Sequence, residues 1–291
     1  MGTQSSGFWT YYPDKIRAAL PFLSPEDKRD LADALEAKEH ADIDERCSRD
    51  PLYWAQEWTK TENPKYLEMG LPFRTHFPKK SYFVPLFETF RNSPRLLIPK
   101  TRDMVTSWSA LVWATHQAQW RSAFAIVQSM KDTKAQELVE YAAILWREQP
   151  EFLKARHPLN GQTKNEMRWA NGGRIMGVPA GENQIRTFHP TIWICDEIAF
   201  IPEAEECWNA VHAAGTPQMI GISSAGPGWM AEQCASFAGL PAAPMVMREP
   251  PPEPVPTVEP EVKELTDEEW AMRILTHDPQ KEAWAKSQGR I

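Results

Sequence analysis

The sequence lacks several features that would place the chain in a specialised class of protein. Its four cysteines form no Cys-x-x-Cys pair and no cluster with histidine, so neither a zinc site nor a disulfide framework is predicted, and a reducing, cytosolic setting fits. No apolar run approaches the ~20 residues of a membrane span, and no secretory signal opens the chain. The net charge of −7 excludes a surface coated in basic residues, but not a local basic patch.

What the sequence does contain is enough apolar material for a sizeable core, with 42% hydrophobic residues and 13 tryptophans. Eight prolines in the twenty residues from 241 to 260 predict an extended linker. We therefore predict four regions: an N-terminal helical segment or lid (1–90), a core (91–236), a proline-rich linker (237–262) and a short helical tail (263–291).

Apolar runs that alternate with amphipathic stretches predict an α/β fold with a mainly parallel central sheet flanked by helices. Strands are predicted at 95–98, 123–127, 192–195 and 218–226. Helices are predicted at 24–47, 51–58, 81–91, 107–120, 132–147 and 204–214, with Asp132 as a cap. A hairpin over 165–176 turns at Asn171-Gly172-Gly173. Residues 59–80 are predicted to be a loop.

The main functional signal is the stretch Ile192-Trp193-Ile194-Cys195-Asp196-Glu197, in which a short apolar run leads into two adjacent carboxylates. Open α/β folds bind ligands at the carboxyl ends of their strands. In nucleotide hydrolases the first acid holds Mg²⁺, and the second orients or deprotonates the attacking water. The alternative is a strand that ends in a solvated acidic turn.

A second signal lies between residues 95 and 120, where an apolar strand enters a polar turn and a helix follows. This layout cradles phosphates on the amides of the helix N-terminus. The alternative is a solvated basic turn after a strand.

In their order and spacing, these blocks resemble the ATPase domain of the large terminase subunit, the motor that packages DNA into tailed-phage capsids. The resemblance covers roughly residues 50–236. Its blocks are the lead-in Asp50-Pro51-Leu52-Tyr53-Trp54, the phosphate loop Lys100–Trp108, Gln128-Ser129 with Lys134–Val139, Asn171–Ile175, Ile185-Arg186, the Walker B strand Ile194–Glu197 and the coupling motif Ile222–Ala225.

The resemblance implies a P-loop NTPase of the RecA/ASCE kind that uses ATP and Mg²⁺. It implies the following roles: ATP binding by Lys100, Thr101, Arg102, Asp103, Met104, Val105, Thr106, Ser107 and Trp108; Mg²⁺ binding by Ser107 and Asp196; catalysis by Glu197 as base and Arg186 as arginine finger; coupling by Ser223 and Ser224.

The phosphate loop departs from the usual GxxxxGK[ST] pattern, because Val105 replaces the glycine and Thr106 replaces the lysine. Valine does not readily take the positive φ that glycine allows. Lys100 or Arg102 would then supply the cation for the phosphates. A weakened or lost ATPase activity stays open.

Several of these roles have structural alternatives. Arg186 can equally form a surface ion pair, and Ser223 and Ser224 can simply cap a strand end. Tyr82, or another ring in Phe77–Phe83, can stack on adenine or belong to the core.

The resemblance also implies partners: double-stranded DNA, a portal protein, a small terminase subunit and further copies of the chain in a ring, with no membrane, in the host cytoplasm. About fifty residues follow Phe237, too few for the usual nuclease domain. We therefore expect no DNA cleavage by this chain. The nuclease would be either a separate subunit, docked near Trp270 and Trp284, or a domain removed by truncation. The alternatives are a helicase-like repair ATPase and a degenerate nucleotide-binding or DNA-binding structural subunit.

Overall fold

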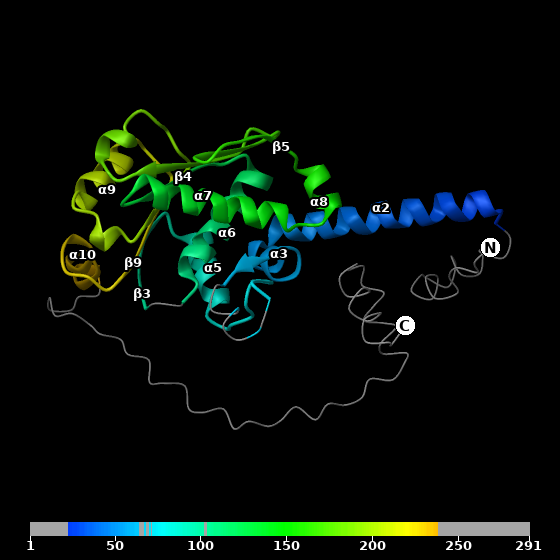
Figure 1. Cartoon of the computed structure of the whole chain (residues 1–291), viewed down its shortest axis with the longest axis horizontal. Helices are drawn as coiled ribbons and strands as arrows, with labels where there is room; N and C mark the ends of the chain where they lie inside the picture. Colours follow the sequence, from blue (N-terminus) through cyan, green and yellow to red (C-terminus); the bar gives the residue numbers. More distant parts are fainter. Residues whose placement is uncertain (1–22, 64–66, 68–69, 71, 102–103, 238–291) are drawn as a thin grey trace, which may run out of the picture. The chain divides into compact units, whose positions relative to one another are not determined.

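The computed structural model describes residues 23–63, 67, 70, 72–101 and 104–237 (Figure 1). The helices are α2 (Pro25–Arg49), α3 (Pro51–Glu57), α5 (Phe83–Asn92), α6 (Thr106–Arg121), α7 (Asp132–Arg147), α8 (Glu151–Arg156), η3 (Glu182–Gln184), η4 (Ile198–Phe200), α9 (Ala204–Ala213) and α10 (Trp229–Phe237). The strands are β1 (Thr61–Glu62), β2 (Arg74–Thr75), β3 (Arg95–Lys100), β4 (Phe124–Ser129), β5 (Leu159–Gln162), β6 (Glu166–Trp169), β7 (Arg174–Pro179), β8 (Ile192–Asp196) and β9 (Gln218–Ser224).

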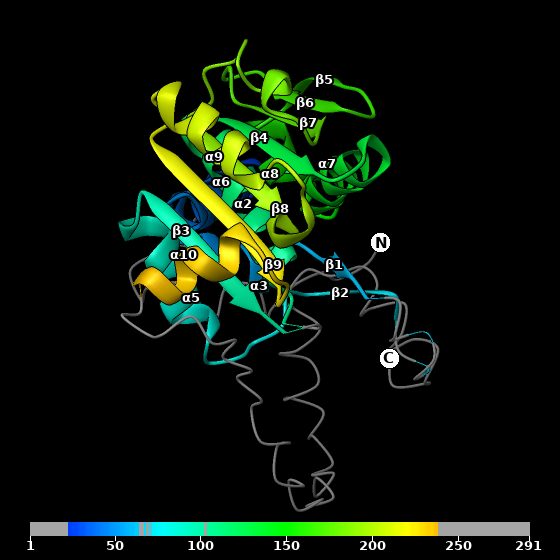
Figure 2. The ribbon, with the colours of Figure 1, turned by 90° about the vertical axis from the view of Figure 1, so that its left-hand side faces the viewer.

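Seven strands form one sheet in the order β3-β9-β8-β4-β7-β6-β5 (Figure 2). The first five are parallel, and β6 and β5 extend the sheet in antiparallel fashion. The strands β1 and β2 pair with each other in a separate small ribbon. The predicted α/β fold with a mainly parallel sheet is therefore confirmed for the described residues.

The sheet is buried on both faces, as its apolar runs predict. Along β8, Ile192 and Ile194 belong to the core on the α6 and α7 face, whereas Trp193 and Cys195 belong to the core beneath η4 and α9. Each fully buried side chain of this size contributes about 1.5–3 kcal/mol. β8 is thereby fixed in register from both sides, and so is the acidic pair that follows it.

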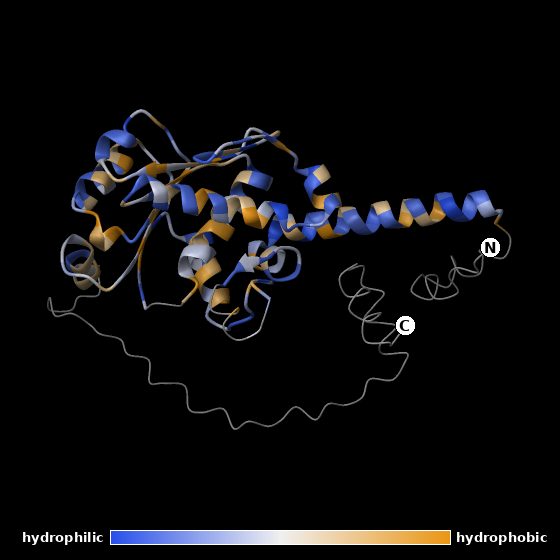
Figure 3. Ribbon diagram, in the orientation of Figure 1, coloured by the Kyte–Doolittle hydropathy of each residue, from blue (hydrophilic) through white to orange (hydrophobic). Residues whose placement is uncertain are grey.

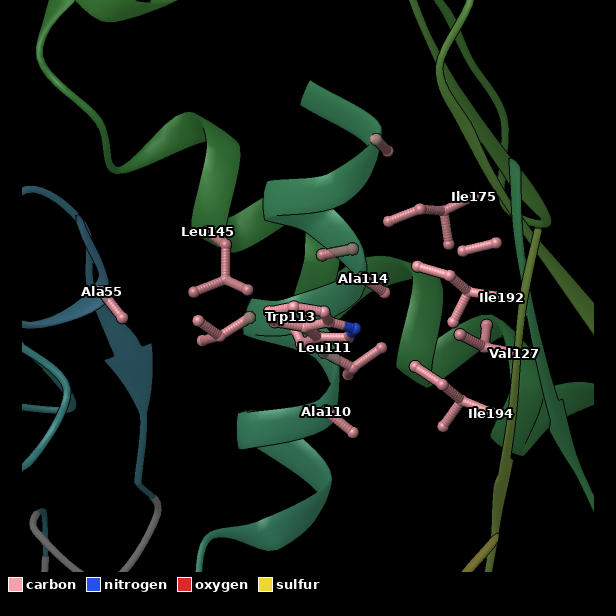
Figure 4. Packing of buried hydrophobic residues seen from close by; sticks show 14 of the residues in the cluster. Ala55, Ala110, Leu111, Trp113, Ala114, Val127, Leu145, Ile175, Ile192 and Ile194 are labelled. Atoms are coloured by element: carbon pink, nitrogen blue, oxygen red, sulfur yellow. The ribbon is translucent and has the colours of Figure 1, made fainter. Parts of the chain in front are cut away.

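Helix α6 lies between the sheet and Ala55 of α3 (Figure 4). Its Leu111 is buried among residues such as Ile194 of the sheet and Leu145 of α7. The predicted hairpin turn packs against the C-terminal end of α6. Asn171 Nδ2 donates to the carbonyl of Gln119 at 2.8 Å, and a Cβ on Gly173 would lie 1.9 Å from the Ala118 carbonyl oxygen. Only glycine allows this approach.

Helix α2 begins with a capping box, in which Ser24 and Asp27 satisfy each other's backbone amides. Most of its length is hydrophilic (Figure 3), and its last turns hold it to the core. Asp44 accepts hydrogen bonds from His157 at 2.7 Å and Trp120 at 2.9 Å. None of the described helices is long and apolar enough to cross a bilayer.

The structure also corrects and extends the predictions. Asp132 is not a cap: it is the first residue of α7, and its carboxylate accepts from Gln136 and Asn165. The sequence did not predict β5, α8, α10 or the β1–β2 ribbon, which interrupts the loop expected over 59–80. The linker (beyond Phe237) and the tail, with Trp270 and Trp284, lie outside the described residues.

Candidate nucleotide-binding site

Three neighbouring parallel strands bring the predicted site residues to one edge of the sheet. β9 lies between β3 and β8, with Lys100 opposite Ser224 and Asp196 opposite Ile222. The carboxyl ends of parallel strands meet at the same edge. Residues far apart in the sequence are thereby gathered around the start of α6.

The first cluster is a hydroxyl and a carboxylate. Ser107 Oγ, in the first turn of α6, donates to Asp196 Oδ1 at 2.8 Å. Burial raises the pKa of Asp196, and the Ser107 hydrogen bond opposes this shift only in part. Magnesium prefers such oxygen ligands and keeps several waters. This pair therefore fits the expected Mg²⁺ site, although no group of three or more His, Cys, Asp or Glu among the described residues forms a protein-only metal cage.

The second cluster surrounds Glu197. Lys100 Nζ lies 3.0 Å from Oε1. Oε2 accepts from Ser223 Oγ at 3.1 Å, Ser224 Oγ at 2.9 Å and the Ser224 amide at 3.2 Å. Burial tends to raise the pKa of Glu197, but Lys100 and Ser224 outweigh it and the net shift is downward. The side chain is therefore held as a carboxylate, as a catalytic base requires.

In the candidate phosphate loop, Val105 has a backbone conformation that is more typical of glycine. Val105 has φ 56° and ψ 20°, so it adopts the left-handed conformation that we expected valine to avoid. It precedes α6, which has no side-chain cap. The first amides of the helix consequently lack an intramolecular acceptor from a cap, and an anion is the natural ligand for such a helix end.

Of the other loop residues, Thr101 is exposed, Thr106 is buried, and Arg102 and Asp103 lie outside the described residues. The carbonyl of Met104 accepts a hydrogen bond from the Tyr82 hydroxyl at 3.2 Å. Tyr82 thus contacts the candidate phosphate loop.

Trp108 stacks on Tyr141 of α7, with the ring centroids 4.3 Å apart. Tyr141 was not among the predicted residues, although it lies three residues after the core residue Leu138 and so shares its helix face. Phe77 and Phe83 are buried, which leaves neither a free ring face for a nucleotide base.

Arg186 is not among the residues gathered at the strand ends. Its guanidinium is exposed and pairs with Glu182 at 2.6 Å, which is the surface ion pair named above as the alternative to an arginine finger. Ser223 and Ser224, in contrast, do more than cap a strand, because both bind the carboxylate of Glu197.

The described residues thus form an open α/β domain with a polar, charged cluster at the carboxyl ends of its central strands. No family model matches the sequence, and no curated protein matches it. Among solved structures, the chain is similar to the large terminase of bacteriophage HK97, with a TM-score of 0.45 and 10% identity, over 60% of this chain and 37% of that one. It is also similar to the large terminase ATPase domain of Thermus phage P74-26, with a TM-score of 0.39 and 14% identity, over 59% of this chain and 73% of that one. A mutant of that domain matches with a TM-score of 0.38 and 16% identity, over 59% and 74%. At these identities the likeness is one of fold alone.

Proposed function

We propose that this chain is an ATP-hydrolysing motor subunit of a viral DNA-packaging terminase, which moves double-stranded DNA into a procapsid through a portal. The observation that carries the proposal is the convergence of Ser107–Asp196 and Lys100–Glu197 at the uncapped start of α6. Two oxygen ligands suited to Mg²⁺ (Ser107 and Asp196), a candidate base (Glu197) and a cation suited to phosphate (Lys100) lie together at the edge of the sheet where α/β folds bind ligands.

In this proposal each side chain has a distinct task. Ser107 and Asp196 would hold Mg²⁺, which would supply positive charge to stabilise the phosphates of the substrate. Glu197 accepts a hydrogen bond from the attacking water and positions it. Lys100 exchanges its carboxylate partner for the phosphates. Ser223 and Ser224, the last two residues of β9, hold Glu197 in place and thereby couple its position to that strand.

The motor assignment rests on more than the site, because the sequence blocks from Asp50 to Ala225 follow the terminase order. In this role the partners are double-stranded DNA, a portal protein, a small terminase subunit and further copies of the chain in a ring. The setting would be the cytoplasm of an infected bacterium.

ATP hydrolysis by the purified chain, with and without double-stranded DNA and portal-bearing empty procapsids, tests the proposal. We expect Mg²⁺-dependent turnover that DNA and procapsids stimulate, and DNA that becomes protected from added nuclease. Nucleotide binding without turnover under every condition would instead indicate a degenerate structural subunit. Strand separation without packaging would indicate a helicase-like repair ATPase.

Arg186 is proposed as an arginine finger that acts across a subunit boundary. For this role the guanidinium must leave Glu182, and its exposure makes that inexpensive because exposed pairs contribute about 0–1 kcal/mol. Mixing inactive Arg186→Ala chains with inactive Glu197→Gln chains should partly restore turnover. No restoration at any ratio would contradict action between subunits.

A further inference from the structure

A pocket of about 330 Å³ lies directly beside the candidate site. Its walls come from η4, the start of α9 and the start of α10, and include Ile198, Phe200, Ile201, Glu206 and Trp229. We call it the η4–α10 pocket. η4 begins at the residue after Glu197, and Pro227 of the opposite wall lies three residues after Ser224. The two segments that leave the candidate catalytic strands therefore form the two sides of one pocket.

The pocket has an apolar floor and an acidic rim. Ile198 and Ile201 are buried, whereas Phe200 is 45% exposed. Glu205 and Glu206 line the pocket and are exposed, and neither forms an ion pair with a described residue. Acids in the first turn of α9 also suit the helix dipole, but that explanation does not account for the exposed phenylalanine or the pocket.

The apolar floor and the acidic rim indicate which kind of group would bind in the pocket. The volume is at the lower end of the roughly 300–1,000 Å³ of ligand pockets, which suits one or two protein side chains better than a large cofactor. The carboxylates repel the phosphates of a nucleic acid. An apolar side chain next to a lysine or arginine satisfies both the floor and the rim.

The same chain presents such a pair elsewhere on its surface. Four large hydrophobic residues are exposed among the described residues: Leu67, Val84, Met130 and Phe200. Of these, Met130 is the one directly followed by a cationic residue, Lys131, which is also exposed and forms no ion pair with a described residue. Met130 is 44% exposed, and its flexible side chain adapts readily to an irregular pocket.

The positions of the two features suit contact between copies. Met130 follows β4, and the pocket follows β8 and β9, so both lie at the carboxyl edge of the sheet. Met130 leads into α7 on one face of the sheet, whereas the pocket is bounded by α9 and α10 on the other. Two different surfaces that fit each other make a heterologous contact, which repeats from copy to copy and closes into a ring or continues as a filament.

We propose that the η4–α10 pocket is the seat for the Met130-Lys131 tip of a second copy of this chain. Met130 packs against Phe200, and Lys131 lies between Glu205 and Glu206. The contact itself is independent of the proposed ATPase activity. One consequence does rest on that activity. The Phe200 ring lies 3.3 Å from the position that a Cβ on Gly226 would take, so Phe200 contacts the loop that follows Ser224. A side chain bound in the pocket would therefore contact the segment after Glu197 and influence the segment after Ser224.

Cysteine crosslinking tests the contact without any need for nucleotide. In a Cys234→Ser background the remaining cysteines, Cys47, Cys195 and Cys207, are buried. A tagged chain with Met130→Cys is mixed with an untagged chain with Ala199→Cys, a small residue in the pocket lining. Mild oxidation should give a disulfide-linked heterodimer. The matched control is Val84→Cys in place of Met130→Cys, which should crosslink much less although it also starts from an exposed hydrophobic residue.

Charge reversal then tests the rim. Glu205→Lys with Glu206→Lys on the Ala199→Cys chain should slow crosslinking by roughly fivefold or more at low salt, and the difference should shrink at high salt. Lys131→Glu on the Met130→Cys chain should restore the rate, provided that circular dichroism shows each variant to be folded. The proposal is overturned if no heterodimer forms at any concentration, if Val84→Cys crosslinks equally well, or if charge reversal has no effect. It is also overturned if only a different protein protects Ala199→Cys from a maleimide reagent, because the pocket then belongs to that partner.

Discussion

Lys100 Nζ and Glu197 Oε1 form an ion pair at 3.0 Å. The pair joins the carboxyl end of β3 to the residue after β8, across the carboxyl end of β9, which lies between these two strands. One partner is the proposed phosphate cation and the other is the proposed base. The Lys100 side chain is only 12% exposed, so the attraction between the two charges is screened less than in a surface pair, while the buried ammonium also carries a desolvation cost. Lys100 therefore neutralises the charge of Glu197, and a phosphate group must compete with Glu197 for Lys100.

Replacing Lys100 with alanine should raise the dissociation constant for ATP by roughly 10- to 100-fold, because a hydrogen bond to a charged group contributes about 1.5–3 kcal/mol. Titration with a fluorescent ATP analogue measures the change. Arg102→Ala, measured in the same way, shows whether the other cation of residues 100–108 binds the phosphates instead. If both single variants and the double variant bind and hydrolyse ATP normally, residues 100–108 are not the phosphate loop.

Asp196→Asn should have opposite effects with and without ligand. Burial raises the pKa of Asp196, so its contribution to folding is favourable at low pH and is lost as pH rises through the raised value. At neutral pH the asparagine variant should therefore have a higher melting temperature than the ligand-free parent protein. It should also lose most of the further stabilisation by Mg²⁺ and ATP. Thermal melts at pH 7.5 with and without both ligands test this, and a lower ligand-free melting temperature would contradict it.

Val105→Gly should be more stable than Val105→Ala. A residue with a Cβ pays roughly 1–2 kcal/mol for the left-handed conformation that Val105 adopts, and glycine does not. Urea denaturation should show glycine ahead by about 1 kcal/mol. At Glu88, an exposed position inside α5, alanine should instead exceed glycine by about 1 kcal/mol. The same order at both positions would mean that Val105 carries no backbone strain.

His116 should make the protein sensitive to acid. Its ring is buried, Nε2 donates to the Cys47 carbonyl at 2.8 Å, and burial lowers the pKa to about 4. Because the folded-state pKa lies below the ordinary value of about 6.5, the stabilisation is complete above pH 6.5 and is lost as pH falls towards 4. The loss should approach about 3 kcal/mol in the free energy of unfolding.

Denaturation curves at several pH values between 7 and 4 measure this loss. His116→Gln should flatten the dependence, whereas the matched variant His189→Gln, at an exposed position, should leave it unchanged. An equally steep dependence in His116→Gln would assign the acid sensitivity to other groups.

The elements that bury continuous apolar runs were predictable from the sequence, because β8 and β9 carry that pattern in their own residues. β5 was not, since Leu159 is its one large apolar residue and its pairing is supplied by β6. At the site, adjacency along the chain indicated Asp196 and Glu197. The Lys100–Glu197 contact depends on the strand order β3-β9-β8, which local pattern does not encode. The left-handed conformation of Val105 was not expected, because valine intrinsically disfavours a positive φ, whereas the loop and α6 impose one at this position.

The most direct test of the central claim is Glu197→Gln, assayed for both ATP binding and ATP turnover. Glutamine keeps the size of the side chain but cannot act as a base, so turnover should fall by roughly 100-fold or more while ATP affinity stays the same or increases. The matched control Glu88→Gln, an exposed position in α5, should behave as the parent chain does. Near-normal hydrolysis by Glu197→Gln, or an unaltered chain that binds no ATP, would contradict the account.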